Sequence, residues 1–134
     1  MNDEADVVTL LQRVFRPGPI KRVPKKQHEA EIFMALSLVD MDPEGIFEET
    51  DINRHLSRWL ESIAAQNGNA DYVTLRRALV DHGFLRRASD GVIYRIRGER
   101  IDEVLTPAAK AVDPVAIFNE VQAARSQRRA DHKS

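Results

Sequence analysis

The sequence predicts a mainly α-helical fold with one small β-hairpin, which places the chain in the α+β class. Three observations favour this class. Several segments repeat apolar residues with the spacing of an amphipathic helix. Two short β-type runs flank an Asp-Gly dipeptide at residues 90–91, a strong hairpin signal. Of the 134 residues, 43% are hydrophobic and 31% are charged, a balance that allows one core and argues against disorder.

The first helix is predicted over residues 7–15, and it ends before Pro17-Gly18-Pro19. Its apolar stripe has the spacing i, i+3, i+4 and i+7 and consists of Val7, Leu10, Leu11 and Val14. We interpret residues 1–16 as an N-terminal helical arm with one apolar face.

The second helix is predicted from Lys25 to Val39, directly after Pro24. Its inward stripe consists of Ile32, Phe33, Leu36 and Val39. The apolar surface is widened by Ala30, Met34, Ala35 and Leu38. We therefore expect a central helix. Residues 40–45 contain acids, a proline and a glycine, which predict a loop.

The third helix, predicted over residues 49–64, has the most regular stripe of the chain. The stripe consists of Ile52, Leu56, Trp59, Leu60 and Ile63. Because Trp59 belongs to this stripe, we assign it to the core and not to a ligand site. Asp71 is a good N-cap for a fourth, short helix that runs to His82 and ends at Gly83.

Phe84–Arg87 and Val92–Ile96 predict the two strands of the hairpin. A lone hairpin is marginal in water, so this one must pack on the helices. Asp113-Pro114 predicts the start of a last helix, whose stripe consists of Ile117, Phe118, Val121 and Ala124. From Arg125 onward we expect a polar, frayed tail.

The order of helix, helix, short helix and hairpin is that of a winged helix-turn-helix domain. In such a domain the third core helix enters the major groove of DNA. We therefore expect a winged helix core over residues 20–100, flanked by the arm at residues 1–16 and by a C-terminal helical extension at residues 101–134. Together they form one domain.

Residues 71–87, followed by Asp90-Gly91 and Tyr94, resemble a prokaryotic family named domain of unknown function 2087. Upstream, its pattern of aromatic, acid, aliphatic and asparagine is matched by Phe47, Glu49, Ile52 and Asn53. Residues 21–26 resemble the basic lead-in of the family, and the resemblance extends over residues 20–97. It implies a winged-helix-like fold and suspected nucleic-acid binding.

The chain departs from the family pattern at two places. The connection from Ser62 to Ala70 is longer than usual, which can move the helix that follows it. Arg95 stands where an aromatic residue often follows the hairpin tyrosine. Both terminal helices lie outside the matched region.

The net charge is −1, but the charges are segregated along the chain. Residues 14–26 carry five cations and no acid, whereas residues 27–66 carry nine acids and two arginines. Residues 71–100 carry seven arginines and four acids. The basic stretches can therefore share a face of the folded protein, although the net charge is close to zero.

The sequence contains no cysteine, which excludes disulfides and thiolate metal sites. This composition fits a reducing compartment, so we expect a cytoplasmic protein. The first residues are acidic and lack the pattern of a signal peptide. Nowhere do about 18 apolar residues follow one another, so no membrane partner is expected.

The candidate nucleic-acid interface begins on the fourth helix. On a helical wheel, the inner side contains Tyr72, Leu75, Ala78, Leu79 and His82. The outer side contains Val73, Thr74, Arg77 and Asp81. Thr74 and Arg77 can therefore contact phosphates or bases, with Arg76 at the boundary. Alternatively, Arg77 pairs with Asp81, and Arg76 braces an acid within residues 48–51.

Four hairpin arginines complete this interface, namely Arg86, Arg87, Arg95 and Arg97. A wing that carries arginines is well placed to bind phosphates. Successive strand residues face opposite sides, so only about two of the four can face one partner. The alternative is that they protect an exposed sheet edge from aggregation. Tyr94 fits either face.

The sequence predicts no catalytic residue, no cofactor site and no metal site, and therefore no enzyme. The four histidines are too scattered for a zinc motif. His82 beside Gly83 is explained by the dipole at a helix C-terminus. Asp51 and His55 share one helix face, but this face lies at the margin of the core.

We therefore expect a DNA-binding or transcription-associated protein that reads duplex DNA with residues 71–82 and 84–97. The alternative is a protein-interaction module, in which the terminal helices and the acidic region contact a protein partner. Because the apolar stripes of the terminal helices would promote association if exposed, we also expect a homodimer. The stripes can instead cover residues 25–39 within one chain.

Overall fold

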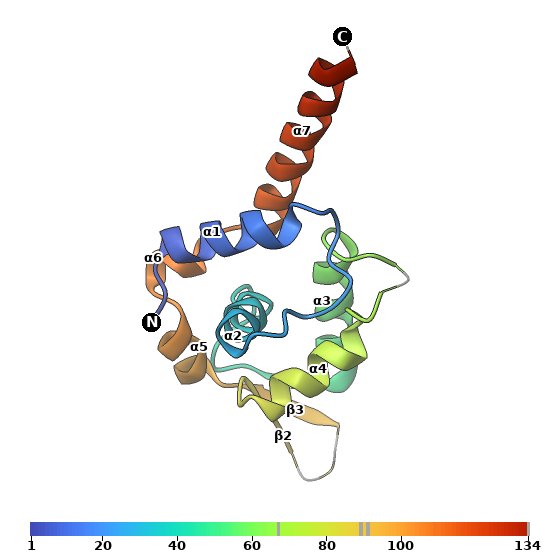
Figure 1. The fold of residues 1–134 in the computed structure, drawn as a ribbon. Coiled ribbons are helices and arrows are strands. Elements are labelled where there is room, and N and C mark those ends of the chain that lie inside the picture. Colours follow the sequence, from blue (N-terminus) through green and yellow to red (C-terminus); the bar gives the residue numbers. More distant parts are fainter. Residues whose placement is uncertain (67, 89, 91, 134) are drawn as a thin grey trace.

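The structure, a computed structural model, describes residues 1–66, 68–88, 90 and 92–133. It is mostly helical with a small antiparallel sheet, which confirms the α+β class (Figure 1). The helices are α1 Glu4–Phe15, α2 Gln27–Leu36, α3 Glu49–Glu61, α4 Tyr72–Asp81, α5 Gly98–Val104, α6 Pro107–Lys110 and α7 Pro114–Lys133. The strands are β1 Ile46–Glu48, β2 Leu85–Arg87 and β3 Ile93–Ile96.

The central position of α2 is confirmed, because residues 32–36 are all at most 1% exposed. The helix is shorter than predicted at both ends. Its N-cap is Lys26, and its C-cap is Ser37, whose hydroxyl donates to the Met34 carbonyl at 2.6 Å. Leu38 then donates its backbone N–H to the carbonyl three residues earlier, at 3.1 Å. This tighter pattern ends the α-helix before Val39.

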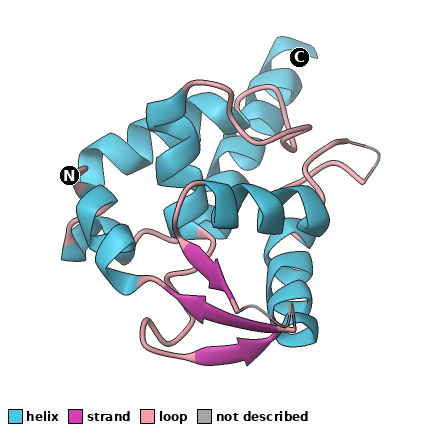
Figure 2. Cartoon of the chain, turned by 90° about the horizontal axis from the view of Figure 1, so that it is seen from below, coloured by secondary structure: helices cyan, strands magenta, loops and turns pink. Residues whose placement is uncertain are grey.

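The sheet has three strands and not only the two of the predicted hairpin. Its order is β1-β3-β2, with β3 antiparallel to both neighbours. Figure 2 shows the three strands side by side at one end of the helical body. A strand of three residues is too short to show an alternating pattern, so β1 was not predicted from the sequence. The predicted hairpin turn includes Ser89 and Gly91, which lie outside the described residues.

The predicted caps of α4 are confirmed. The Asp71 carboxylate accepts from the Thr74 N–H at 2.7 Å, and Gly83 has a φ of +82°, which glycine adopts without a steric penalty. The predicted inner face is wrong at its two ends. Tyr72 is 38% exposed and His82 is also exposed. A short helix rests on the core with its middle turns, so its terminal residues extend past the contact.

The C-terminal region contains more helix than predicted. α5 and α6 were not predicted, and α7 continues through Lys133 instead of fraying after Arg125. The Asp113 carboxylate caps α7 by accepting from the Val115 N–H at 3.0 Å. Residues 123–130 are mostly good helix formers, which favours continuation. In Figure 1 the second half of α7 projects away from the body.

The terminal helices pack on each other within one chain. The rings of Phe15 and Phe118 meet edge to face at 5.2 Å, and Gln122 donates to the Phe15 carbonyl at 3.0 Å. The α1 residues in the core cluster are Val7, Leu10, Leu11 and Phe15. The stripe of α1 is therefore covered without a second chain, and the homodimer stays a prediction.

An ion pair links α1 to α2, and it is expected to make the stability of the protein depend on pH in the acidic range. The Arg13 guanidinium hydrogen-bonds the Glu29 carboxylate and holds the pKa of Glu29 below its usual value of 4.5, although burial opposes this shift. A lowered pKa in the folded state stabilises the protein above the unfolded value. We expect this contribution to be lost as the pH falls below about 4.5, through the lowered pKa.

Thermal melts from neutral to acidic pH test this effect. Arg13→Gln is expected to flatten the acid side of the profile, because it removes the main cause of the shift. An unchanged acid profile in this variant would contradict the assignment.

Candidate nucleic-acid interface

α4 presents the two residues expected on its outer side. Thr74 and Arg77 are both exposed. Within the described residues, no hydrogen bond or ion pair engages the Arg77 guanidinium, so the alternative pair with Asp81 is not formed. Arg77 and Asp81 both line a surface hollow between α4 and the sheet. This arginine therefore remains available to a ligand.

Arg76 is held inside the protein. Its side chain is 14% exposed, its guanidinium donates to the side-chain amide oxygen Oδ1 of Asn53, and it lies 3.6 Å from Glu49 Oε1. These contacts are the ones expected from the alternative interpretation, in which Arg76 pairs with an acid within residues 48–51. The guanidinium connects α4 to α3, so binding DNA would require breaking this link.

Tyr94 lies on the inner face of the sheet and is 2% exposed. Its hydroxyl donates to Glu49 Oε2 at 3.0 Å, and burial together with this bond raises the pKa of Tyr94. The Glu49 carboxylate therefore joins α3 to both α4 and β3. Sequence reasoning noted Glu49 only as part of the family pattern, because its two partners are distant in the chain.

The hairpin arginines divide between two faces of the sheet. Arg86 and Arg95 are direct cross-strand partners and both are exposed, whereas Arg87 pairs in register with Tyr94. Since successive residues alternate, Arg87 lies on the side of α4 and the other two on the opposite side. Of these three hairpin arginines, only Arg87 lines the hollow that Arg77 also lines.

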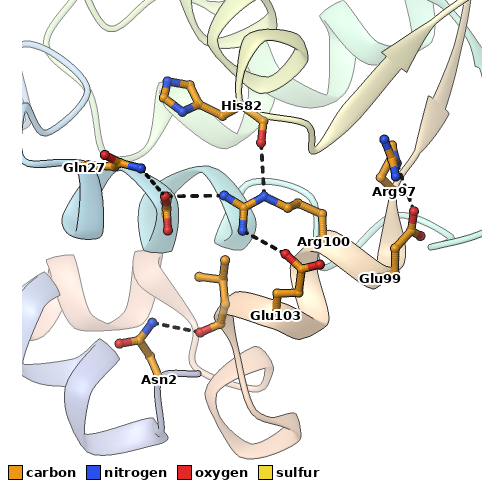
Figure 3. Close-up of polar contacts among 9 residues, drawn as sticks. Asn2, Gln27, His82, Arg97, Glu99, Arg100 and Glu103 are labelled. Atoms are coloured by element: carbon orange, nitrogen blue, oxygen red, sulfur yellow. Dashed lines mark hydrogen bonds and ion pairs between the residues drawn. The ribbon is translucent and has the colours of Figure 1, made fainter.

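Arg97 lies at the end of β3, where its guanidinium pairs with Glu99 at 2.9 Å. The backbone amide of Glu99 and then Arg97 lower the pKa of this carboxyl. In Figure 3 the ion pair of Arg97 and Glu99 lies to one side of the contacts that Arg100 makes. Arg97 therefore does not join the α4 hollow.

Arg100 was not predicted as a functional or structural residue. It donates to the His82 carbonyl at 3.1 Å and lies 3.4 Å from Glu31 and 3.3 Å from Glu103 (Figure 3). Its guanidinium also lies 4.6 Å from the centre of the Phe84 ring. It ties the end of α4 to α2 and α5. No local pattern reveals such a role, because most of its partners come from distant segments.

The hollow beside α4 has mixed charge. Its lining residues are Glu49, Arg76, Arg77, Val80, Asp81, Arg87 and Tyr94. Two carboxylates therefore oppose three arginines, and Arg86 and Arg95 face the other way. These arginines do not form one continuous basic face.

The described residues were also compared with the requirements of a metal site and of a membrane-spanning helix. Among them, no group of three or more histidine, aspartate or glutamate side chains is placed to hold a metal ion. His55 contacts the Ser37 carbonyl at 2.7 Å, at the end of α2. None of the helices in the described ranges is long and apolar enough to cross a membrane.

The fold and this site define a small, mainly helical protein whose short fourth helix and three-stranded sheet border an arginine-lined hollow. Residues 19–96 match the family described as "Uncharacterized protein conserved in bacteria (DUF2087)". The match covers more than half of the chain, so the chain belongs to this family, as the sequence resemblance indicated. Comparisons with curated proteins and with solved structures gave no match.

Proposed function

We propose that this protein is a winged helix DNA-binding factor that reads duplex DNA with α4. The element order α2, β1, α3, α4, β2 and β3, with sheet order β1-β3-β2, supports the winged helix assignment. In this arrangement α4 is the recognition helix, and the β2–β3 hairpin is the wing. A cytoplasmic location is part of the proposal, in keeping with a chain that has no cysteine.

The observation that carries the proposal is the Arg77 guanidinium on the exposed side of α4, which no described residue engages by a hydrogen bond or an ion pair. Arginine is the side chain most often used to contact guanine, because its fork matches the two acceptors of that base. Thr74 lies three residues earlier, hence on the same side of the helix. Asp71 is already occupied by the Thr74 N–H, so it competes less for Arg77 than a free carboxylate would.

The wing contributes through Arg87, which borders the same hollow as Arg77. Arg76 serves in this proposal as a positioning residue, because its contacts with Glu49 and Asn53 fix α4 on α3. Arg86, Arg95 and Arg97 lie outside the α4 surface. We therefore narrow the base-reading set to Thr74 and Arg77, with Arg87 as a phosphate contact.

Replacing Arg77 by alanine is expected to weaken binding to duplex DNA by about 1 to 3 kcal/mol, roughly 5- to 150-fold in Kd. Fluorescence anisotropy with labelled random duplexes, at several salt concentrations, measures this change. Arg54→Ala is the control, because Arg54 is an exposed arginine of α3 whose Asp51 partner lies 3.5 Å away. It should leave Kd nearly unchanged.

If the wild-type protein shows no salt-dependent binding at micromolar concentration and low salt, the proposal is wrong. The alternative hypothesis, that the protein is a protein-interaction module, is then favoured. One feature favours that alternative: Ile46 is 56% exposed on the outer face of the sheet, in register with Arg95. An exposed apolar residue beside cations suits a protein surface of opposite charge.

A further inference from the structure

The loop between α1 and α2, residues 16–26, is the most strongly basic segment of the chain, and we call it the basic linker. Its cations are Arg16, Lys21, Arg22, Lys25 and Lys26, and it contains no acid. All five side chains are exposed. Within the described residues, none of the five takes part in an ion pair or a side-chain hydrogen bond. The nearby Glu29 carboxylate is hydrogen-bonded by Arg13, and the charge of Lys26 also contributes to its lowered pKa.

The backbone of the basic linker is fixed against the connection between α3 and α4. Ile20 donates to the Ile63 carbonyl at 2.9 Å and accepts from the Ala65 N–H at 2.8 Å. The Lys21 carbonyl accepts from Asn69 at 2.6 Å and from Ala70 at 3.1 Å. In Figure 1 the blue loop runs beside the green connection.

Gly68 permits this close approach. A Cβ atom at this position would lie 2.6 Å from the Lys21 carbonyl oxygen and 2.9 Å from the Lys21 Cα. Only glycine fits without moving the backbone. Ile20, which is 5% exposed, anchors the same stretch in the core. The position of the basic linker is therefore part of the fold.

This position places cations at the beginning of the recognition helix. Ala70, which donates to Lys21, directly precedes Asp71, the N-cap of α4. At the other end of the linker, Arg125 of α7 donates to the Pro17 carbonyl at 2.7 Å. Arg16, Arg128 and the acid Glu120 line one hollow between α1 and α7. Cations thus lie on α7, along the linker and beside the start of α4, with Glu120 and Asp71 as the acids among them.

We propose that the basic linker binds the phosphate backbone of duplex DNA next to the groove that α4 enters. This inference rests on the proposed function, since it takes the ligand of α4 as given. Exposed lysines and arginines without acid partners bind phosphates with little dependence on sequence. The linker supplies the positive charge that the mixed hollow beside α4 lacks.

The test compares two double variants of the full chain that lose the same charge. Lys21→Gln with Arg22→Gln removes two linker cations, and Arg54→Gln with Arg58→Gln removes two exposed cations of α3. Thermal melts establish that both variants are folded. Anisotropy with a random duplex of about 20 base pairs, over a series of salt concentrations, gives Kd and its salt dependence.

The linker variant is expected to bind about 10- to 100-fold more weakly at 0.1 M salt. Its slope of log Kd against log salt should fall by about 2, because each phosphate contact contributes about 0.9. The loss should be similar for all duplex sequences. The α3 variant should keep a slope close to that of the wild type.

Equal slopes for the linker variant and the wild type would overturn this inference and leave the role of α4 standing. Absence of any duplex binding by the wild type would instead remove the proposed function itself. A polyglutamate competitor that displaces the duplex as well as an unlabelled duplex of equal charge does would also overturn the assignment to phosphate, and it would point to an acidic protein.

Discussion

Replacing Leu75 by alanine is expected to destabilise the protein by about 2 to 5 kcal/mol. Leu75 is 0% exposed and lies in the middle of α4, where it belongs to the main core cluster. The substitution removes buried carbon and leaves a cavity that a packed core closes only in part. Denaturant unfolding and thermal melts measure the loss.

Thr74→Ala is the control for this prediction, because Thr74 is the exposed neighbour on the same helix and should change stability by about 0.5 kcal/mol or less. Trp59→Ala should lower the free energy of unfolding by less than the replacement of a fully buried tryptophan would. Trp59 is only partly buried, and its ring meets Phe33 edge to face at 4.9 Å. A Leu75 variant that melts like the wild type would show that the faces of α4 are misassigned.

Replacing Phe15 by alanine is expected to cost about 3 to 5 kcal/mol. Phe15 is 0% exposed, and its ring meets Phe118 of α7. The backbone carbonyl of Phe15 also accepts from Gln122. The substitution therefore loosens the contact that holds both terminal helices to one chain.

Denaturant unfolding measures this effect, with Gln12→Ala on the exposed side of α1 as its control. A Phe15 variant with wild-type stability would mean that the two apolar stripes do not depend on each other. Light scattering on the wild type would then decide whether a second chain covers them, as the homodimer prediction requires.

Several elements were predictable because their signals are local. The helical spacing of Val7, Leu10 and Leu11 revealed α1, and the Asp71 cap and Gly83 set the limits of α4. These signals need only the residues within one or two turns. Strand β1 and helix α5 have no such pattern over their three and seven residues, and they were not predicted. Helix α6 was not predicted either, although Thr106 and Pro107 carry the same local start signal as Asp113 and Pro114.

In the candidate site, too, local features were predictable and long-range contacts were not. The sequence singled out the arginines of residues 71–100 but not their roles. Arg76 and Arg77 are adjacent in the chain, yet one is bound to Glu49 and Asn53 and the other is exposed. Arg86 and Arg95 lie on one face of the sheet and Arg87 on the other.

The sequence by itself determined where α1, α2, α3, α4 and the start of α7 lie, where the hairpin strands lie and where positive charge is concentrated along the chain. These properties depend on periodicity and composition, which are local. Only the tertiary structure decided that Lys21 lies beside the start of α4, and that Arg100 ties His82 to Glu31. Such contacts join residues far apart in the chain, and they arise from the packing of whole elements, which no local pattern encodes.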